Sequence, residues 1–154
     1  MTRHWLMKSE PAECSIDDLA RAPNQTLPWV GVRNYQARNF MRDNMAVGDG
    51  VLFYHSSCAQ PGVAGLATIA GPACPDLTQF NPDSPYFDAK SQRELPRWLQ
   101  IDVTLTRKTR LMSLQELRNE TRLIDMQVLA RGNRLSVTPV SLAHWQIVLT
   151  LLDA

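Results

Sequence analysis

The segment Leu99–Thr106 constrains the fold of this chain most, because its side chains alternate between apolar and polar residues. The apolar positions are Ile101, Val103 and Leu105, and the polar positions between them are Asp102, Thr104 and Thr106. Successive side chains of a β-strand point to opposite faces of the sheet, so this period predicts a half-buried strand in an antiparallel sheet. The other segments must fit around such a sheet.

Other short segments are also typical of strands. Val51–Tyr54 is an apolar run that suits a buried strand, and Val63–Ala70 combines small and branched residues. The glycine inside Val63–Ala70 indicates a bulge or a close backbone approach. His4–Lys8 predicts an opening strand that stops before Pro11, which has no N–H to donate. Leu135–Val137 predicts a brief strand near the end of the chain.

Serine caps mark the starts of short helices. A serine followed three residues later by an acidic residue is a capping box, in which both side chains bond to backbone N–H groups. This pattern predicts a helix Ile16–Arg21 behind Ser15 and Asp18, and a helix to Arg118 behind Ser113 and Glu116. Ser141 is expected to begin the final helix, and Leu123–Ala130 to add a turn or two. We see no repeat and no linker, so residues 1–154 are expected to form a single domain.

Residues 71–96 contain many prolines and show little periodicity, with Phe80, Tyr86 and Phe87 scattered among them. Loops this long are uncommon inside a compact domain. Such a loop is usually functional or held to the surface by its aromatic residues.

The stretch Trp29–Asn39 gathers aromatic residues, arginines and asparagines around one glycine. If residues 34–41 are helical, Ala37, Phe40 and Met41 form an anchoring face and Tyr35, Arg38, Asn39 and Arg42 the opposite, polar face. Pro28 and Gly31 interrupt regular structure, so we expect Trp29 in a loop that leads into the helix N-terminus. An indole beside free N–H donors suits a flat, polar ligand such as a nucleobase.

The composition is that of a folded domain, with 44% hydrophobic and 20% charged residues. A formal net charge of +1 gives no overall attraction to polyanions, so a nucleic-acid partner would have to be recognised by a local patch or pocket. The three cysteines are widely spaced, which indicates a reducing compartment. No segment predicts a secretory signal or a membrane span, and we expect a cytoplasmic protein without a membrane partner.

Patterns for catalysis, metals and cofactors are weak. His55 precedes Ser56 and Cys58, but neighbours in sequence rarely form a catalytic triad, and no nucleophile elbow is present. His4, His55 and His144 lack metal-ligand spacing, and no phosphate-binding glycine loop occurs. The sequence therefore predicts no catalytic residue, no metal and no cofactor.

A pocket that reads a base requires an aromatic plane, fixed donors and acceptors, and nearby cations. Trp29 and Tyr35 are the candidate planes; Tyr54 and Trp98 are held in reserve and are expected to belong to the core. Small polar groups for the base edge are Ser9, Asn34, His55 and Ser56, and cations for flanking phosphates are Lys8, Arg33, Arg38 and Arg134.

Four segments together resemble the EVE domain family: Trp5–Pro11, Trp29–Asn39, Phe53–Ser56 with Pro61–Gly65, and Arg134–Val137. The resemblance covers nearly the whole chain. It implies an α+β, PUA-like fold, a mixed β-barrel or curved sheet flanked by short helices. It also implies a pocket that reads modified bases, notably modified cytosine, at Ser9, Trp29, Val32, Asn34, Tyr35, Arg38, His55 and Ser56, with Arg134 and Ser136 as secondary candidates.

The leading hypothesis is a non-enzymatic module that binds DNA or RNA and takes a flipped-out or single-stranded modified base into this pocket. One alternative is an enzyme that acts on nucleic acid or a nucleotide, with His55 as general base. A second alternative is a module that binds a small molecule or a protein.

Overall fold

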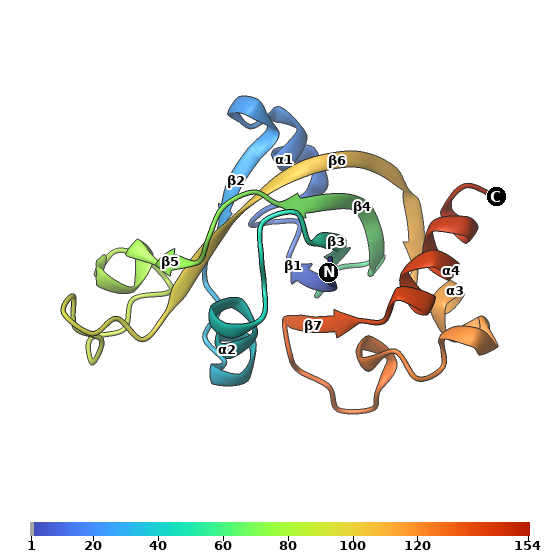
Figure 1. Cartoon of the computed structure of the whole chain (residues 1–154). Helices are drawn as coiled ribbons and strands as arrows, with labels where there is room; N and C mark the ends of the chain where they lie inside the picture. Colours follow the sequence, from blue (N-terminus) through green and yellow to red (C-terminus); the bar gives the residue numbers. More distant parts are fainter. Residues whose placement is uncertain (1) are drawn as a thin grey trace.

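The strands form one curved sheet (Figure 1). The computed structural model describes residues 2–154, and within that range the sheet has seven strands in the order β2-β6-β4-β3-β1-β7, with β5 paired to β6. Their bounds are β1 His4–Ser9, β2 Thr26–Trp29, β3 Gly50–His55, β4 Gly62–Ile69, β5 Cys74–Pro75, β6 Leu99–Ser113 and β7 Val137–Val140. β1 and β3 pair in parallel, and the other ladders are antiparallel. The expected α+β class with a curved mixed sheet is confirmed.

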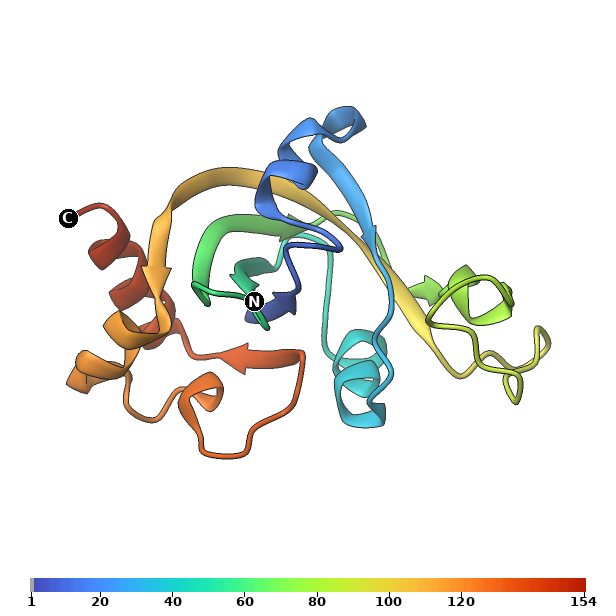
Figure 2. The same cartoon turned by 180° about the vertical axis from the view of Figure 1, so that it is seen from behind.

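The long strand β6 arches over β4 and β3 in both views (Figures 1 and 2). The predicted strand Leu99–Thr106 is the first part of it. Against β4, the register shifts between Val63 and Gly65, and such bulges bend a strand. A Cβ at Gly65 would lie 2.5 Å from Ile16 Cδ1, so the backbone can approach the first helix only without a side chain there. The bulge and close approach predicted for Val63–Ala70 are therefore confirmed.

Both faces of the central strands are buried, because hydrophobic clusters cover the sheet on either side. In β1, Trp5 and Met7 belong to one cluster, whereas Leu6 between them belongs to the other. The first cluster contains Trp29, and the second contains Val148 from the last helix. Burial on both faces explains why the apolar run predicted for β3 does not alternate.

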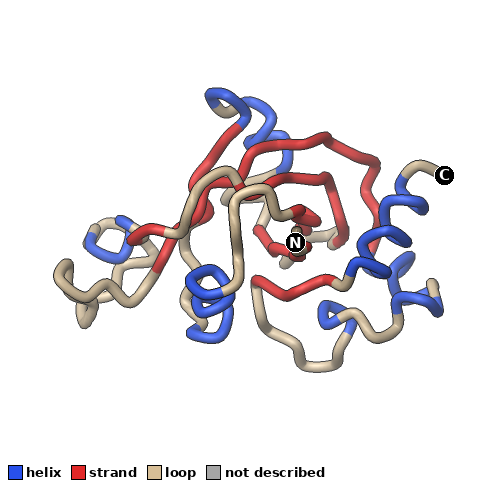
Figure 3. Tube along the Cα trace, viewed as in Figure 1, coloured by secondary structure: helices blue, strands red, loops and turns tan. Residues whose placement is uncertain are grey.

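Short helices flank the sheet (Figure 3). They are α1 Ile16–Arg21, α2 Tyr35–Asp43, α3 Leu114–Asn119 and α4 Leu142–Leu152. Both predicted capping boxes are present, before α1 and before α3, and Ser141 caps α4. None of the helices in residues 2–154 is both long and apolar enough to cross a membrane.

Several predicted bounds are wrong. Trp29 is the last residue of β2 and pairs with Ile101, whereas we expected a loop there. Pro28 hid this strand because proline has no N–H for a ladder, and an edge strand tolerates that loss. The segment Leu123–Ala130 does add a turn, which is a 3₁₀ turn at Gln127–Leu129, whereas the last strand begins at Val137 instead of Leu135.

Candidate functional site

A cavity of about 810 Å³ opens beside the edge strand β2 and the ends of the central strands β1 and β3. Its lining comes from the end of β1, from β2 and the turn after it, from the end of β3, and from the segment that leads into β7. β2 and β7 lie at opposite ends of the strand order, so a gap remains where a closed barrel would join them. The volume lies within the range of small-molecule sites, roughly 300–1,000 Å³.

The structure brings most of the predicted site residues to this cavity. Those in its lining are Lys8, Ser9, Trp29, Val32, Ser56, Arg134 and Ser136. Backbone bonds join the segments that carry them: Lys8 N–H donates to Ser136 O at 2.8 Å, and Ser56 N–H donates to Ser9 O at 2.9 Å. The sheet itself therefore fixes how these segments sit around the cavity.

Aromatic rings form the walls. Trp29 is 8% exposed and meets Phe53 edge to face, with ring centroids 5.2 Å apart. Tyr86, from the long loop, provides another wall and packs against Gly31 so closely that a Cβ on Gly31 would lie 2.6 Å from the ring. The Tyr86 hydroxyl donates to the Glu13 carboxylate, and burial together with this bond raises the pKa of Tyr86 to about 12.

Some polar groups of the lining are engaged within the protein and others are not. The Ser9 hydroxyl donates to Cys14 O at 2.7 Å. Lys8 is half-buried, and no hydrogen bond or ion pair of its ammonium group is found within residues 2–154. Burial lowers the pKa of Lys8. A desolvated cation without a partner favours an anionic or electron-rich ligand, so Lys8 is a candidate to contact a ligand in the cavity, as is Arg134, the other cation of the lining.

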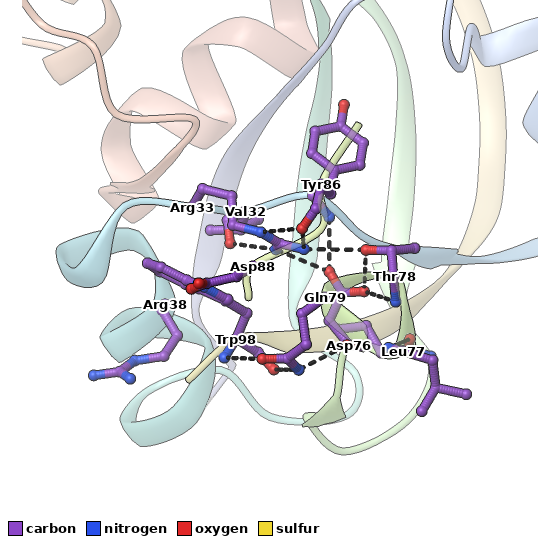
Figure 4. A network of polar contacts seen from close by, with 12 residues as sticks. Val32, Arg33, Arg38, Asp76, Leu77, Thr78, Gln79, Tyr86, Asp88 and Trp98 are labelled. Carbon is purple, nitrogen blue, oxygen red and sulfur yellow. Dashed lines mark hydrogen bonds and ion pairs between the residues drawn. The ribbon is translucent and has the colours of Figure 1, made fainter. Parts of the chain in front are cut away.

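A buried carboxylate holds the wall of the cavity in place (Figure 4). Asp76 is 0% exposed and accepts from Gly31 N–H at 2.9 Å, from Arg33 Nη1 at 3.1 Å and from Thr78 N–H at 2.8 Å. Arg33 also donates to the carbonyl of Tyr86, at 2.7 Å from Nη2. The network thus ties the turn after β2 to the loop that carries Tyr86.

Five predicted site residues lie outside the cavity lining, and their side chains have other partners. Arg33 is engaged in the Asp76 network, which leaves it less suited to the phosphate contact that we predicted. The Asn34 side chain accepts from Ala37 N–H at 3.0 Å and caps α2. Our expectation that the Trp29 indole and the Asn34 amide border one cavity therefore holds for Trp29 alone. An N-cap before a helix is a local signal that we overlooked.

His55 also points elsewhere. Its Nε2 accepts from Ile16 N–H at 3.1 Å, at the start of α1, and it lines a separate cavity of about 430 Å³. Burial lowers the pKa of His55, which keeps the ring neutral and able to accept.

Tyr35 and Arg38 occupy the exposed side of α2. Tyr35 is 51% exposed and stacks on Trp98, with centroids 4.7 Å apart, and the Arg38 guanidinium carbon lies 4.8 Å from the Tyr35 centroid. Of the reserve aromatics, Tyr54 and Trp98 are both buried, as expected for core residues.

Sequence reasoning missed Tyr86 and Asp76 as parts of this site. Tyr86 was visible only as one aromatic residue in the long loop, and that loop was expected to be functional or fixed by its aromatic residues. The local signal of Asp76 is only that of a cap, since it accepts from Thr78 N–H, and its partners Gly31 and Arg33 lie 45 and 43 residues away.

The curved mixed sheet with short helices around it is the architecture of a PUA-like domain. The chain belongs to the EVE domain family, which matches residues 3–151.

Similar proteins support this assignment. Human thymocyte nuclear protein 1 is 40% identical, over 98% of this chain and 74% of its own length. The crystal structure of a Pseudomonas putida protein has a TM-score of 0.91 and 46% identity, covering 96% of this chain and 98% of that one. The crystal structure of human THYN1 protein in complex with 5-methylcytosine containing DNA has a TM-score of 0.94 and 40% identity, covering 99% of each chain.

Proposed function

We propose that this chain is a non-enzymatic module that binds nucleic acid and holds a modified base, such as a modified cytosine, in the 810 Å³ cavity. The observation that carries the proposal is the combination of aromatic walls from Trp29 and Tyr86 with the ammonium group of Lys8, which has no hydrogen-bond or ion-pair partner among residues 2–154. A flat heterocycle gains from stacking, and its carbonyl oxygens and ring nitrogens can accept from Lys8. The relative crystallised with 5-methylcytosine containing DNA supports the same ligand class.

Selectivity for the modification follows from desolvation. A methyl group that fills an apolar niche is worth about 0.8 kcal/mol, which corresponds to roughly fourfold in affinity. We therefore expect a short single strand with one 5-methylcytosine to bind about fourfold more tightly than the same strand with cytosine. Calorimetric titration with DNA and RNA versions of each strand would decide between the two nucleic acids. If free 5-methylcytidine bound as tightly as the strands, the cavity would be a small-molecule site.

Lys8→Met tests the cavity with little risk to the fold, because the Lys8 side chain makes no bond to the described residues and methionine keeps its length. Its matched control is Lys108→Met, since Lys108 pairs with Asp17 outside this cavity. Lys8→Met should weaken binding, and Lys108→Met should not. Equal affinity of the Lys8 variant and the unchanged protein for every strand would refute the proposal.

We do not favour the enzyme with His55 as general base. Nε2 already accepts a backbone N–H, and His55 lies outside the lining that holds Trp29. The expected cytoplasmic location stays a prediction.

A further inference from the structure

A stack of side chains leads from the cavity to the surface of α2. The Arg33 guanidinium carbon lies 5.5 Å from the ring centroids of both Tyr86 and Trp98, which places a cation between these two rings. Trp98 in turn stacks on Tyr35, at 4.7 Å and with 27° between the planes. The stack therefore starts at the Tyr86 wall of the cavity and ends on a half-exposed ring.

Arg38 forms the outer end of this stack. Its guanidinium carbon lies 4.8 Å from the Tyr35 centroid, as expected for residues three apart on a helix. Nη1 donates to Arg97 O at 2.8 Å, and Nε and Nη2 donate to Asn39 Oδ1 at 3.1 and 2.8 Å. These bonds fix the plane of the guanidinium, and in Figure 4 the Arg38 side chain extends away from the Asp76 network.

The charge of Arg38 has no carboxylate within ion-pair distance among the residues that the structure describes, whereas its basic neighbours do. Arg33 pairs with Asp76 at 3.1 Å, and Arg97 lies 3.6 Å from Asp88. Arg42, one turn further along α2, pairs with Asp43 at 2.8 Å. A guanidinium held flat by neutral acceptors, over a half-exposed ring, keeps both its charge and one stacking face for a partner.

We infer that Arg38, supported by Tyr35, is a second binding position, for the nucleotide that flanks the base in the cavity. The inference rests on the proposed function. Tyr35 follows the cavity residue Val32 by three residues, so their Cα atoms are at most about 11 Å apart, which is within reach of an adjoining nucleotide. Bases stack on arginine planes as well as on aromatic rings, and the neighbouring phosphate is attracted to the uncompensated charge. The partner is therefore a single strand of at least two nucleotides.

The test uses five-nucleotide single strands with 5-methylcytosine at the centre. In two further strands, the nucleotide on one side or the other of the modified base is abasic, which removes the flanking base and leaves every phosphate in place. For the unchanged protein, one of the two abasic strands should bind at least about fivefold more weakly than the full strand. Arg38→Gln should abolish that difference, and Arg42→Gln, the matched control on the same helix, should retain it.

Tyr35→Ala provides a second variant, and thermal unfolding of each variant shows whether its fold is intact. The inference is supported if Arg38→Gln and Tyr35→Ala bind the full strand and the abasic strand with equal affinity, while Arg42→Gln still binds the abasic strand more weakly. Two results overturn it while leaving the proposed function standing: no penalty from either abasic strand, or equal effects of Arg38→Gln and Arg42→Gln. If Lys8→Met also changes no affinity, the proposed function fails and the second position fails with it.

Discussion

Gly31→Ala would show how strongly the Tyr86 wall depends on one missing side chain. Gly31 has φ +83°, a left-handed conformation that costs a non-glycine residue about 1–3 kcal/mol. A Cβ there would also lie 2.6–2.8 Å from three atoms of the Tyr86 ring, and overpacking of this kind costs about 1–3 kcal/mol more. We therefore expect the free energy of unfolding to fall by about 2–6 kcal/mol, the sum of both effects.

Gly48→Ala is the matched control. Gly48 has φ +96°, and a Cβ there would meet nothing within 4 Å, so this variant carries the backbone cost alone. The entropy that alanine removes from the unfolded chain affects both variants alike and cancels in the comparison. The difference between the two variants, measured by urea unfolding, should therefore be the clash with Tyr86, about 1–3 kcal/mol.

A double-mutant cycle isolates the clash. In a Tyr86→Ala background the ring is absent, and Gly31→Ala should cost no more than Gly48→Ala does. If Gly31→Ala costs the same with and without the ring, the close packing of Tyr86 on Gly31 does not hold the wall, and our account of the cavity is wrong. Lower affinity of Gly31→Ala for the 5-methylcytosine strand would link the same wall to binding.

Three further predictions concern buried or half-buried polar groups. Asp76→Ala leaves Arg33 without its carboxylate and should lower the free energy of unfolding by about 3–5 kcal/mol in urea; a loss below about 1 kcal/mol would contradict the network. Asp49→Ala removes the acceptor of the buried Trp5 Nε1–H, at 3.0 Å, and should cost at least about 1 kcal/mol by the same measurement. His55 has a lowered pKa in the folded state, so its contribution to stability is present above its ordinary pKa of 6.5 and is lost as the pH falls through the lowered value. His55→Gln should therefore reduce the fall in Tm on acidification, and an unchanged fall would contradict this reasoning.

Features set by neighbouring residues could be predicted from the sequence. The capping boxes before α1 and α3 lie within four residues, and the structure has both. The strand β2 could not be predicted in this way, because its ladder joins Thr26 to Thr104, and Pro28 weakens the local signal. Which segments meet at the cavity followed from the family resemblance, since periodicity gives no information on how distant segments pair.

The roles of polar side chains were harder to predict for a related reason. Asn34 and His55 were chosen as groups that could face a base, yet each accepts a backbone N–H, from Ala37 and Ile16. Buried or half-buried backbone donors at helix starts need acceptors, and nearby polar side chains supply them. A sequence shows that a polar residue is present, but only the assembled chain shows whether its hydrogen-bonding capacity remains for a ligand.

The hydrogen bonds that side chains already make within the protein also limit how the cavity can recognise a base. A hydroxyl carries one proton, and that of Ser9 is donated to Cys14 O, so Ser9 can serve a ligand only as an acceptor. The Tyr86 proton is likewise committed to Glu13. With these groups engaged in the protein's own structure, Lys8 is left as the charged donor of the β1 segment, and the apolar part of the lining, Tyr86 included, must provide most of the contact area. Recognition then depends on how completely a ligand fills the cavity, and a base that lacks its modification leaves part of that apolar surface uncovered.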